Sequence, residues 1–285
     1  MVAIGSGVGN HMQALMLGRN AYLQWIKTVY CCRMRQAISP HENSSPVVNF
    51  YETPARLRIL GADGGIAKDC RTNCFLFDKD ILIDAGTGLG DLDVDSMAKI
   101  DYIFLTHVHM ERIACLPLVI DTVFASQRSP ITIYVPGNDR GKLLKDIFND
   151  VVWLNFTRMP SPASPVVQFK PMVQEINLGG RRIGMLPANH HSLAVGVWIN
   201  RGDGTLVFTG NMGPCGEFWL AYEKLSDVTH FIVECSFPNE LEDLAHKMGH
   251  LTPALLEQEL KCLNGNPQVF ATLMKPATKV ERWAN

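Results

Sequence analysis

The chain lacks several features that would assign it to a particular class of protein. No apolar run among its 285 residues is long enough to span a bilayer, and no cleavable secretory signal precedes the body. A net charge of −2 gives no general attraction for nucleic acid or for an anionic membrane. The eight cysteines are scattered, several of them inside apolar stretches, which suits buried thiols in a reducing compartment better than a disulfide framework. These absences predict a cytoplasmic protein with no transmembrane segment and no nucleic-acid partner.

Acidic residues are missing from the first part of the chain. Residues 1–41 contain four basic residues and no Asp or Glu, and apolar residues between Leu15 and Val29 are spaced as in a short amphipathic helix. This helix could contact a membrane surface or act in targeting. A partly disordered tail, or a start codon placed upstream of Met34, explains the same composition. We therefore expect residues 1–55 to be an extension and linker, and residues 56–285 to form one domain.

What is present from residue 56 onward is a regular mixture of short strands, glycine turns and helices, with 47% apolar residues over the whole chain and no internal repeat. Such a mixture over more than 200 residues favours a layered α/β domain. The predicted strands are Leu57–Leu60, Cys74–Phe77, Ile81–Asp84, Asp101–Leu105, Ile131–Val135, Arg182–Leu186, Val195–Ile199, Leu206–Thr209 and Phe231–Glu234, and the predicted helices are Lys142–Phe148 and Pro253–Leu263.

Histidines and other polar residues follow these strands. His107 and His109 come directly after a buried strand and are one residue apart, so a tight turn could aim both imidazoles at one ion. The segments Asn189-His190-His191, Thr209-Gly210-Asn211 and Gly249-His250-Leu251-Thr252-Pro253 follow later in the chain. Three imidazoles and a water molecule form an open site that suits Zn, Fe or Mn.

In this order, the motifs resemble the metallo-β-lactamase superfamily, and within it the class II cyclic-nucleotide phosphodiesterases. The resemblance covers roughly residues 56–280. It includes Ile83-Asp84-Ala85-Gly86-Thr87, His107-Val108-His109-Met110-Glu111-Arg112, Glu234-Cys235-Ser236-Phe237-Pro238-Asn239 and the His250 segment. The resemblance implies an αβ/βα sandwich, in which two packed mixed sheets are covered by outer helices. It also implies a metal-dependent hydrolase that acts on cyclic AMP or a related phosphodiester.

The resemblance assigns the three imidazoles of the first metal ion to His107, His109 and His190. His190 is preferred to its neighbour His191 because its spacing to the next strand fits the family pattern. His250 matches a histidine that assists proton transfer, and it is the predicted catalytic residue.

The positions that the family uses for a second metal ion differ in this chain. Glu111 replaces an aspartate, Arg112 a histidine, Asn211 a bridging aspartate, and Leu273 the last histidine. Arginine cannot ligate a metal ion, and an amide bridges two cations poorly. We therefore expect a single divalent ion. Arg112 could supply part of the missing positive charge through hydrogen bonds to phosphate oxygens.

Asp84 and Glu234 have two interpretations each. Asp84 could orient a ligand histidine from outside the coordination shell, as could Glu111, or Asp84 could cap the following turn. Glu234 could reach the site or have a structural role. Arg112 and Asn211 are the predicted substrate-binding residues.

Three functions remain open at this stage. The first is a single-metal 3′,5′-cyclic-nucleotide phosphodiesterase, and the second is a sensor that binds a cyclic mono- or dinucleotide without cleaving it. The third is a structural or redox protein. The expected partner is a cyclic nucleotide or another small phosphodiester, and a homodimer is also an expectation.

Overall fold

A computed structural model describes residues 2–4, 57–126 and 129–278 of the chain. The predicted amphipathic helix, the linker and the start-codon alternative lie outside these residues. The strand β1 (Val2–Ile4) is described, and it pairs antiparallel with β15 (Gln268–Thr272) at the edge of one sheet. The boundary predicted between an extension and a domain at residue 56 stays a prediction.

The first sheet has six strands in the order β2-β3-β4-β5-β6-β9. They are β2 (Leu57–Gly61), β3 (Cys74–Phe77), β4 (Ile81–Ile83), β5 (Tyr102–Phe104), β6 (Ile131–Val135) and β9 (Val167–Pro171). The first two pairings are antiparallel, and the three from β4 to β9 are parallel. The sheet is therefore mixed, with parallel strands at its centre.

The second sheet has seven strands in the order β1-β15-β14-β13-β12-β11-β10. They include β10 (Glu175–Leu178), β11 (Arg181–Pro187), β12 (Val195–Asn200), β13 (Thr205–Phe208) and β14 (Val228–Glu234). The pairings of β13 with β14 and of β14 with β15 are parallel, and the others are antiparallel. A separate short hairpin joins β7 (Pro160–Ser161) to β8 (Ser164–Pro165).

The two sheets pack face to face, and alternation along each strand decides which core a side chain enters. In β3, Phe75 and Phe77 enter the core between the sheets, whereas Cys74 and Leu76 point to the helices on the other side. From the second sheet, Phe208 contributes to the same central core and its ring meets that of Phe75 edge to face at 4.9 Å.

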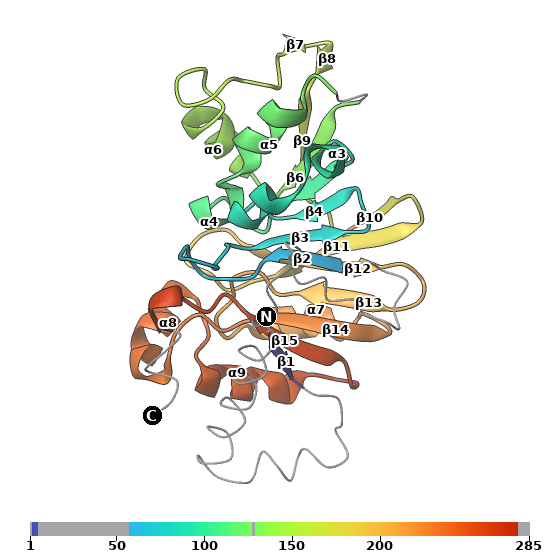
Figure 1. The fold of residues 1–285 in the computed structure, drawn as a ribbon. Coiled ribbons are helices and arrows are strands. Elements are labelled where there is room, and N and C mark those ends of the chain that lie inside the picture. Colours follow the sequence, from blue (N-terminus) through green and yellow to red (C-terminus); the bar gives the residue numbers. More distant parts are fainter. Residues whose placement is uncertain (1, 5–56, 127–128, 279–285) are drawn as a thin grey trace, which may run out of the picture.

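Helices cover both outer faces, giving four layers (Figure 1). Over the first sheet lie α3 (Val94–Met97), α4 (Met110–Ile113), α5 (Leu116–Val123) and α6 (Asp139–Asp146). Over the second sheet lie α7 (Gly216–Tyr222) and α9 (Pro253–Glu259), whose apolar residues join a third core, and α8 (Glu242–Met248) lies beside them. The predicted αβ/βα sandwich is confirmed.

The predicted strands all exist, with ends that differ by three residues or fewer, as at β14. The helix predicted at Lys142–Phe148 begins three residues earlier, at Asp139, and the second predicted helix continues after α9 as a short 3-10 turn, Leu260–Cys262. The sequence prediction missed β9, β10 and β15, in which exposed or half-buried residues interrupt the apolar pattern.

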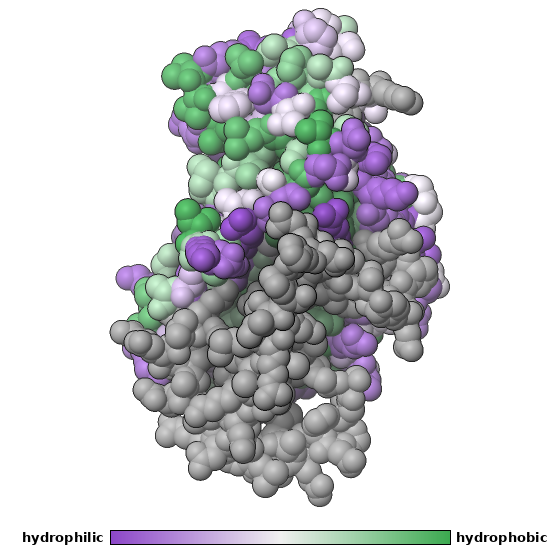
Figure 2. Space-filling view, viewed as in Figure 1, coloured by the Kyte–Doolittle hydropathy of each residue, from purple (hydrophilic) through white to green (hydrophobic). Residues whose placement is uncertain are grey.

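Some apolar side chains remain on the surface near the outer helices. Leu118 and Phe124 are exposed at α5, and Val151, Val152 and Leu154 are exposed in the loop after α6. Figure 2 shows apolar side chains gathered on the part of the molecule that carries α5 and α6. Within the described residues, no helix is both long and apolar enough to cross a membrane.

Candidate metal centre

Most of the predicted site residues lie in loops from both sheets, and Glu111 and Arg112 lie in α4. In the first sheet, Asp84 follows β4, and His107 comes three residues after β5. In the second sheet, His190 comes three residues after β11, Asn211 comes three residues after β13, and His250 lies between α8 and α9. Because loops at strand ends are free of the sheet's own hydrogen-bonding pattern, such positions can present polar side chains to a common site.

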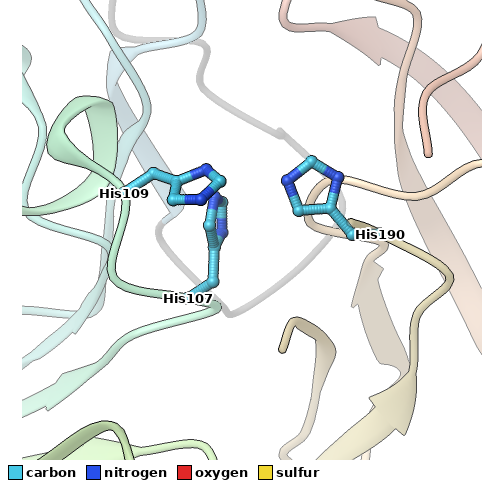
Figure 3. Close-up of side chains that lie close together, drawn as sticks. All are labelled: His107, His109 and His190. Atoms are coloured by element: carbon cyan, nitrogen blue, oxygen red, sulfur yellow. The ribbon is translucent and has the colours of Figure 1, made fainter. Parts of the chain in front are cut away.

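Three imidazoles face one another across the gap between these loops (Figure 3). His107 and His109 come from the segment that enters α4, and His190 approaches from the opposite side. One nitrogen from each ring lies within 4.8 Å of the other two. This group contains the three histidines predicted as metal ligands, and it contains His190 rather than His191.

In His190 and His107, the hydrogen bond made by Nδ1 determines that the other ring nitrogen, Nε2, is free to bind an ion. Nδ1 of His190 lies 3.1 Å from the carbonyl oxygen of Gly249, so Nδ1 must carry the proton and donate it. Nδ1 of His107 lies 3.3 Å from the hydroxyl of Thr106, which is 3.0 Å from both carboxylate oxygens of Asp84. If Thr106 donates to Asp84, its oxygen can accept from His107.

This arrangement leaves Nε2 of both rings with a lone pair directed away from these partners. Nε2 of His107 and Nε2 of His190 are buried and have no hydrogen-bond partner. Buried nitrogen atoms are rarely left unsatisfied, and neutral imidazole is a common ligand of Zn, Fe and Mn. The residues present therefore fit a divalent ion.

Burial also keeps these imidazoles neutral, which metal binding requires. It lowers the pKa of His107 to about 3, although Glu111 opposes the shift. It lowers the pKa of His190 to about 4, against the hydrogen bond to Gly249. The pKa of His109 is lowered too, again mainly by burial.

Glu111 lies beside the imidazoles rather than away from them. Its Oε1 atom is 3.3 Å from Nε2 of His107, 4.0 Å from Nδ1 of His109 and 3.8 Å from Nε of Arg112. Burial by itself raises the pKa of this carboxyl, but the contact with His107 and the charge of Arg112 outweigh it and lower the pKa below its usual range. Glu111 is therefore an anion beside the three histidines.

Arg112 is fully buried, and protein groups occupy both of its terminal nitrogens. Nη1 donates to Asp84 at 2.9 Å, and Nη2 donates to the side-chain oxygen of Asn211. The guanidinium carbon also lies 5.7 Å from the centre of the Phe208 ring. Because Arg112 is 0% exposed, its predicted contact with a substrate phosphate stays a prediction.

Asp84 balances the charge of Arg112 from a backbone conformation that few residues adopt. Its φ is +57°, in the left-handed region where Asp and Asn are tolerated better than most side chains. Burial raises its pKa to about 6, against the opposing effects of Arg112 and of the hydrogen bonds from Thr106. Asp84 thus accepts hydrogen bonds from both Arg112 and Thr106, the residue that directly precedes His107.

His250 borders the centre and is oriented by Glu234 at the end of β14. Its Nδ1 lies 2.9 Å from Oε1 of Glu234, which also accepts from the backbone of Leu251 at 3.1 Å. The centre of its ring is 4.9 Å from that of His190. With Nδ1 committed to Glu234, Nε2 is the nitrogen that remains for proton transfer.

Gly249 is a site residue that the sequence prediction missed. Its φ is +67°, and a Cβ atom there would lie 2.6 Å from Cα of His190. A side chain at this position would therefore displace the histidine that the Gly249 carbonyl orients. The sequence signal was a glycine at the end of a helix, directly before His250. Thr106 was also missed, although it directly precedes His107.

The last position associated with a second ion is apolar. Leu273 is 2% exposed and follows β15, where its backbone N–H donates to Ala62. Asn211, at another such position, donates to Glu111 at 3.4 Å while accepting from Arg112. Among the described residues, the only group of histidine, cysteine or acidic side chains suited to one ion is the three-histidine group.

Comparisons with known proteins agree with the architecture. A model described as the metallo-beta-lactamase superfamily matches residues 67–245. The metallo-beta-lactamase fold protein YhfI from Bacillus subtilis aligns with a TM-score of 0.64 at 17% identity, over 79% of this chain and 88% of that one. Unliganded yeast PDE1 aligns with a TM-score of 0.63 at 17% identity, over 80% and 90%.

A third solved structure gives the same result. The short form of human tRNase Z aligns with a TM-score of 0.60 at 15% identity, over 78% of this chain and 93% of that one. No curated protein matches the sequence. At these identities the similarity establishes the fold, and the chemistry must be argued from the site.

Proposed function

We propose a function from one premise, which is that this chain belongs to the metallo-beta-lactamase superfamily. We infer that it is a hydrolase of small phosphodiesters, with a 3′,5′-cyclic nucleotide as its expected substrate and one divalent ion as its cofactor. The similarity in fold to a protein named PDE1 and to a tRNase Z supports the phosphodiester class. The choice of a cyclic nucleotide rests on the sequence motifs around His107 and His250.

The observation that carries this proposal is the pair of orphaned nitrogens on oriented imidazoles. Nε2 of His107 and Nε2 of His190 are buried without hydrogen-bond partners, although Glu111 lies 3.3 Å from Nε2 of His107. Their Nδ1 atoms contact Thr106 and Gly249. His109 completes the set within 4.8 Å. These three histidines would hold a divalent ion, which would supply Lewis acidity toward a phosphodiester and lower the pKa of a water molecule.

The remaining residues divide the other tasks of the reaction. In this proposal His250, whose Nδ1 contacts Glu234, gives a proton to the departing alkoxide through Nε2. In this proposal Arg112, buried behind the site, offsets the negative charges of Asp84 and Glu111, which would otherwise repel an anionic substrate. Asn211, 4% exposed, is held between Arg112 and Glu111 and is the nearer of the two predicted substrate-binding side chains to solvent.

One observation favours a second candidate, a nucleotide-binding module that does not cleave its ligand. Arg112 is fully buried and engages Asp84 and Asn211, so it is not exposed to a substrate as a second catalytic cation would be. Such a protein would keep the site as a receptor for the phosphodiester and signal through a partner. A homodimer remains an expectation in either case.

The first experiment measures metal content and turnover together. The full chain, purified without added metal, should contain about one equivalent of a divalent ion and should hydrolyse 3′,5′-cyclic AMP. His107→Ala should lose both, whereas His250→Ala should keep the metal and lose turnover. His246→Ala, which removes an exposed imidazole on α8, serves as the control and should lose neither.

The outcomes separate the two candidates. Saturable nucleotide binding without product, in protein that contains its metal, would replace the hydrolase with the binding module. A metal content of zero that is unchanged in His107→Ala would contradict the metal centre. Two equivalents would contradict the single-ion site.

A further inference from the structure

Neither of the two predicted substrate-binding side chains is open to solvent. Arg112 is fully buried, Asn211 is nearly so, and the two are hydrogen-bonded to each other. A phosphodiester carries its negative charge on oxygen atoms that lose water when they bind, so hydrogen-bond donors must replace that water. A phosphodiester site therefore needs a donor from another residue, on the exposed side of the three-histidine centre.

His191 is an exposed imidazole that lies against this centre. The middle of its ring is 4.6 Å from that of His190 and 4.9 Å from that of His109. These are the two partly exposed rings of the centre, whereas the third ring, that of His107, is fully buried. His191 thus contacts the centre on the side from which a substrate would approach.

His191 lies beside the proposed ligands but is not one of them. Among the residues that the structure describes, the group whose ligand atoms all lie within 4.8 Å of one another consists of His107, His109 and His190. The ring of His191 is therefore next to the position of the ion rather than part of its ligand set. From there it can contact a molecule that occupies the open side of the ion.

Contacts on both sides of His191 hold its loop in place. Two residues earlier, the side chain of Asn189 donates to the carbonyl oxygen of Pro214 at 2.9 Å. Two residues later, Leu193 packs so closely on Gly137 that an added Cβ atom there would lie 2.7 Å from Cδ2 of Leu193. A side chain on a loop fixed in this way loses less conformational freedom when a ligand binds.

We propose that His191 binds the phosphate group of the substrate by donating a hydrogen bond to one of its non-bridging oxygens. This inference rests on the proposed function, because it places an ion and a phosphodiester at the centre. A neutral imidazole carries one N–H donor, so the contact does not require a charged ring. The donor stabilises the negative charge of the phosphate from the solvent side, whereas Arg112 is buried.

The test measures the binding of inorganic phosphate and of 5′-AMP to the full, metal-loaded chain by calorimetry, together with the metal content. Binding is the readout because a hydrolase and a binding module must both hold the phosphate. His191→Ala removes the donor, and His191→Gln replaces it with an amide N–H. Ser192→Ala is the matched control, because it changes the next residue of the loop, whose hydroxyl has no hydrogen-bond partner.

We expect His191→Ala to weaken the binding of both probes by about 10- to 100-fold, which is the usual effect of removing a hydrogen bond to a charged group. His191→Gln should recover part of this loss. Ser192→Ala should bind both probes as the wild type does. All three variants should keep about one equivalent of metal, because none of them changes a proposed ligand.

Three results would overturn the inference while leaving the proposed function in place. Unchanged affinity in His191→Ala would show that His191 does not contact the phosphate. Loss of the metal in that variant would show that His191 supports the ion instead. Equal weakening in Ser192→Ala would assign the effect to the loop rather than to the imidazole. A wild-type protein that contains its metal but neither binds the probes nor hydrolyses cyclic AMP would contradict the proposed function itself.

A second measurement does not depend on any variant. A crystal structure of the metal-loaded wild-type protein with phosphate gives the distance from the nearer ring nitrogen of His191 to the phosphate oxygens. A distance of about 2.7–3.2 Å supports the contact. A distance beyond about 3.5 Å, which is too long for a hydrogen bond, contradicts it.

Discussion

Among the described residues, Arg112 is a charged side chain with no exposure to solvent. It is the largest of the fully buried side chains, and its charge is balanced by Asp84 at 2.9 Å. A buried ion pair is costly to form, and removing only one partner leaves the other charge without compensation. Stability should therefore respond much more to the loss of one partner than to the loss of both.

We predict that Asp84→Asn lowers the free energy of unfolding by up to about 3–5 kcal/mol, because it removes the carboxylate 2.9 Å from the buried Arg112 and leaves only Glu111, 3.8 Å from Nε, to balance that charge. Asparagine tolerates the positive φ at this position, so backbone strain does not add to the effect. Urea unfolding in the presence of a chelator measures this change apart from any metal binding.

The double variant Asp84→Asn with Arg112→Met is the control for this interpretation. It removes both charges, and should recover a large part of the stability lost in the single variant. If the double variant is less stable than Asp84→Asn, the destabilisation does not come from an unpaired charge.

At the scale of elements, a cluster of ion pairs joins the two sheets at the turn between β3 and β4. Arg181, at the start of β11 in the second sheet, binds both carboxylate oxygens of Asp80 at 2.6 Å and contacts Asp78 at 3.2 Å. These residues are partly buried, whereas the next residue, Arg182, pairs with Glu175 at an exposed position. The adjacent arginines therefore offer a matched comparison.

We expect Arg181→Ala to lower the free energy of unfolding by about 1–3 kcal/mol, between the values typical of exposed and of buried pairs. Arg182→Ala should cost less than about 1 kcal/mol. Thermal and urea unfolding of the two variants provide the comparison. Equal losses would show that Arg181 does not hold the sheets together more strongly than a surface pair does.

The sequence predicted the strands and the position of the histidines because both depend on local patterns. Runs such as Cys74–Phe77 are apolar throughout, and all four residues are buried. It could not predict that Glu111 turns toward His107, or that Arg112 turns toward Asp84. Those orientations depend on how loops from two sheets meet, which no local pattern records. The strand β15 was missed because its first residue is exposed and its apolar run is short.

For the molecule as a whole, two buried thiols make stability depend on alkaline pH. Burial, the main cause, raises the pKa of Cys74 and of Cys235 well above the usual 9.0. In the unfolded chain both thiols lose protons near that value, whereas in the folded chain they keep them. The unfolded state then binds fewer protons, so stability falls as pH rises above about 9.

We predict that these two thiols contribute a loss of up to about 2.7 kcal/mol per pH unit above this point, from about 1.36 kcal/mol per unit for each group. Urea unfolding between pH 8 and about 10.5 should show a shallower decline in a Cys74→Ala/Cys235→Ala variant. Cys262→Ser, which changes an exposed thiol, should leave the slope as in the wild type. An identical slope in the double variant would contradict the prediction.

The two sides of the proposed centre are far apart along the chain, since His107 and His109 leave the first sheet and His190 leaves the second. During synthesis, a chain that ends before residue 190 has only part of its coordination set. Tight loading of an ion must therefore wait until the second sheet has been made and has docked on the first. Metal occupancy would then indicate that both halves of the sandwich have folded and docked. The cell's supply of the ion would affect the last step of folding rather than the first.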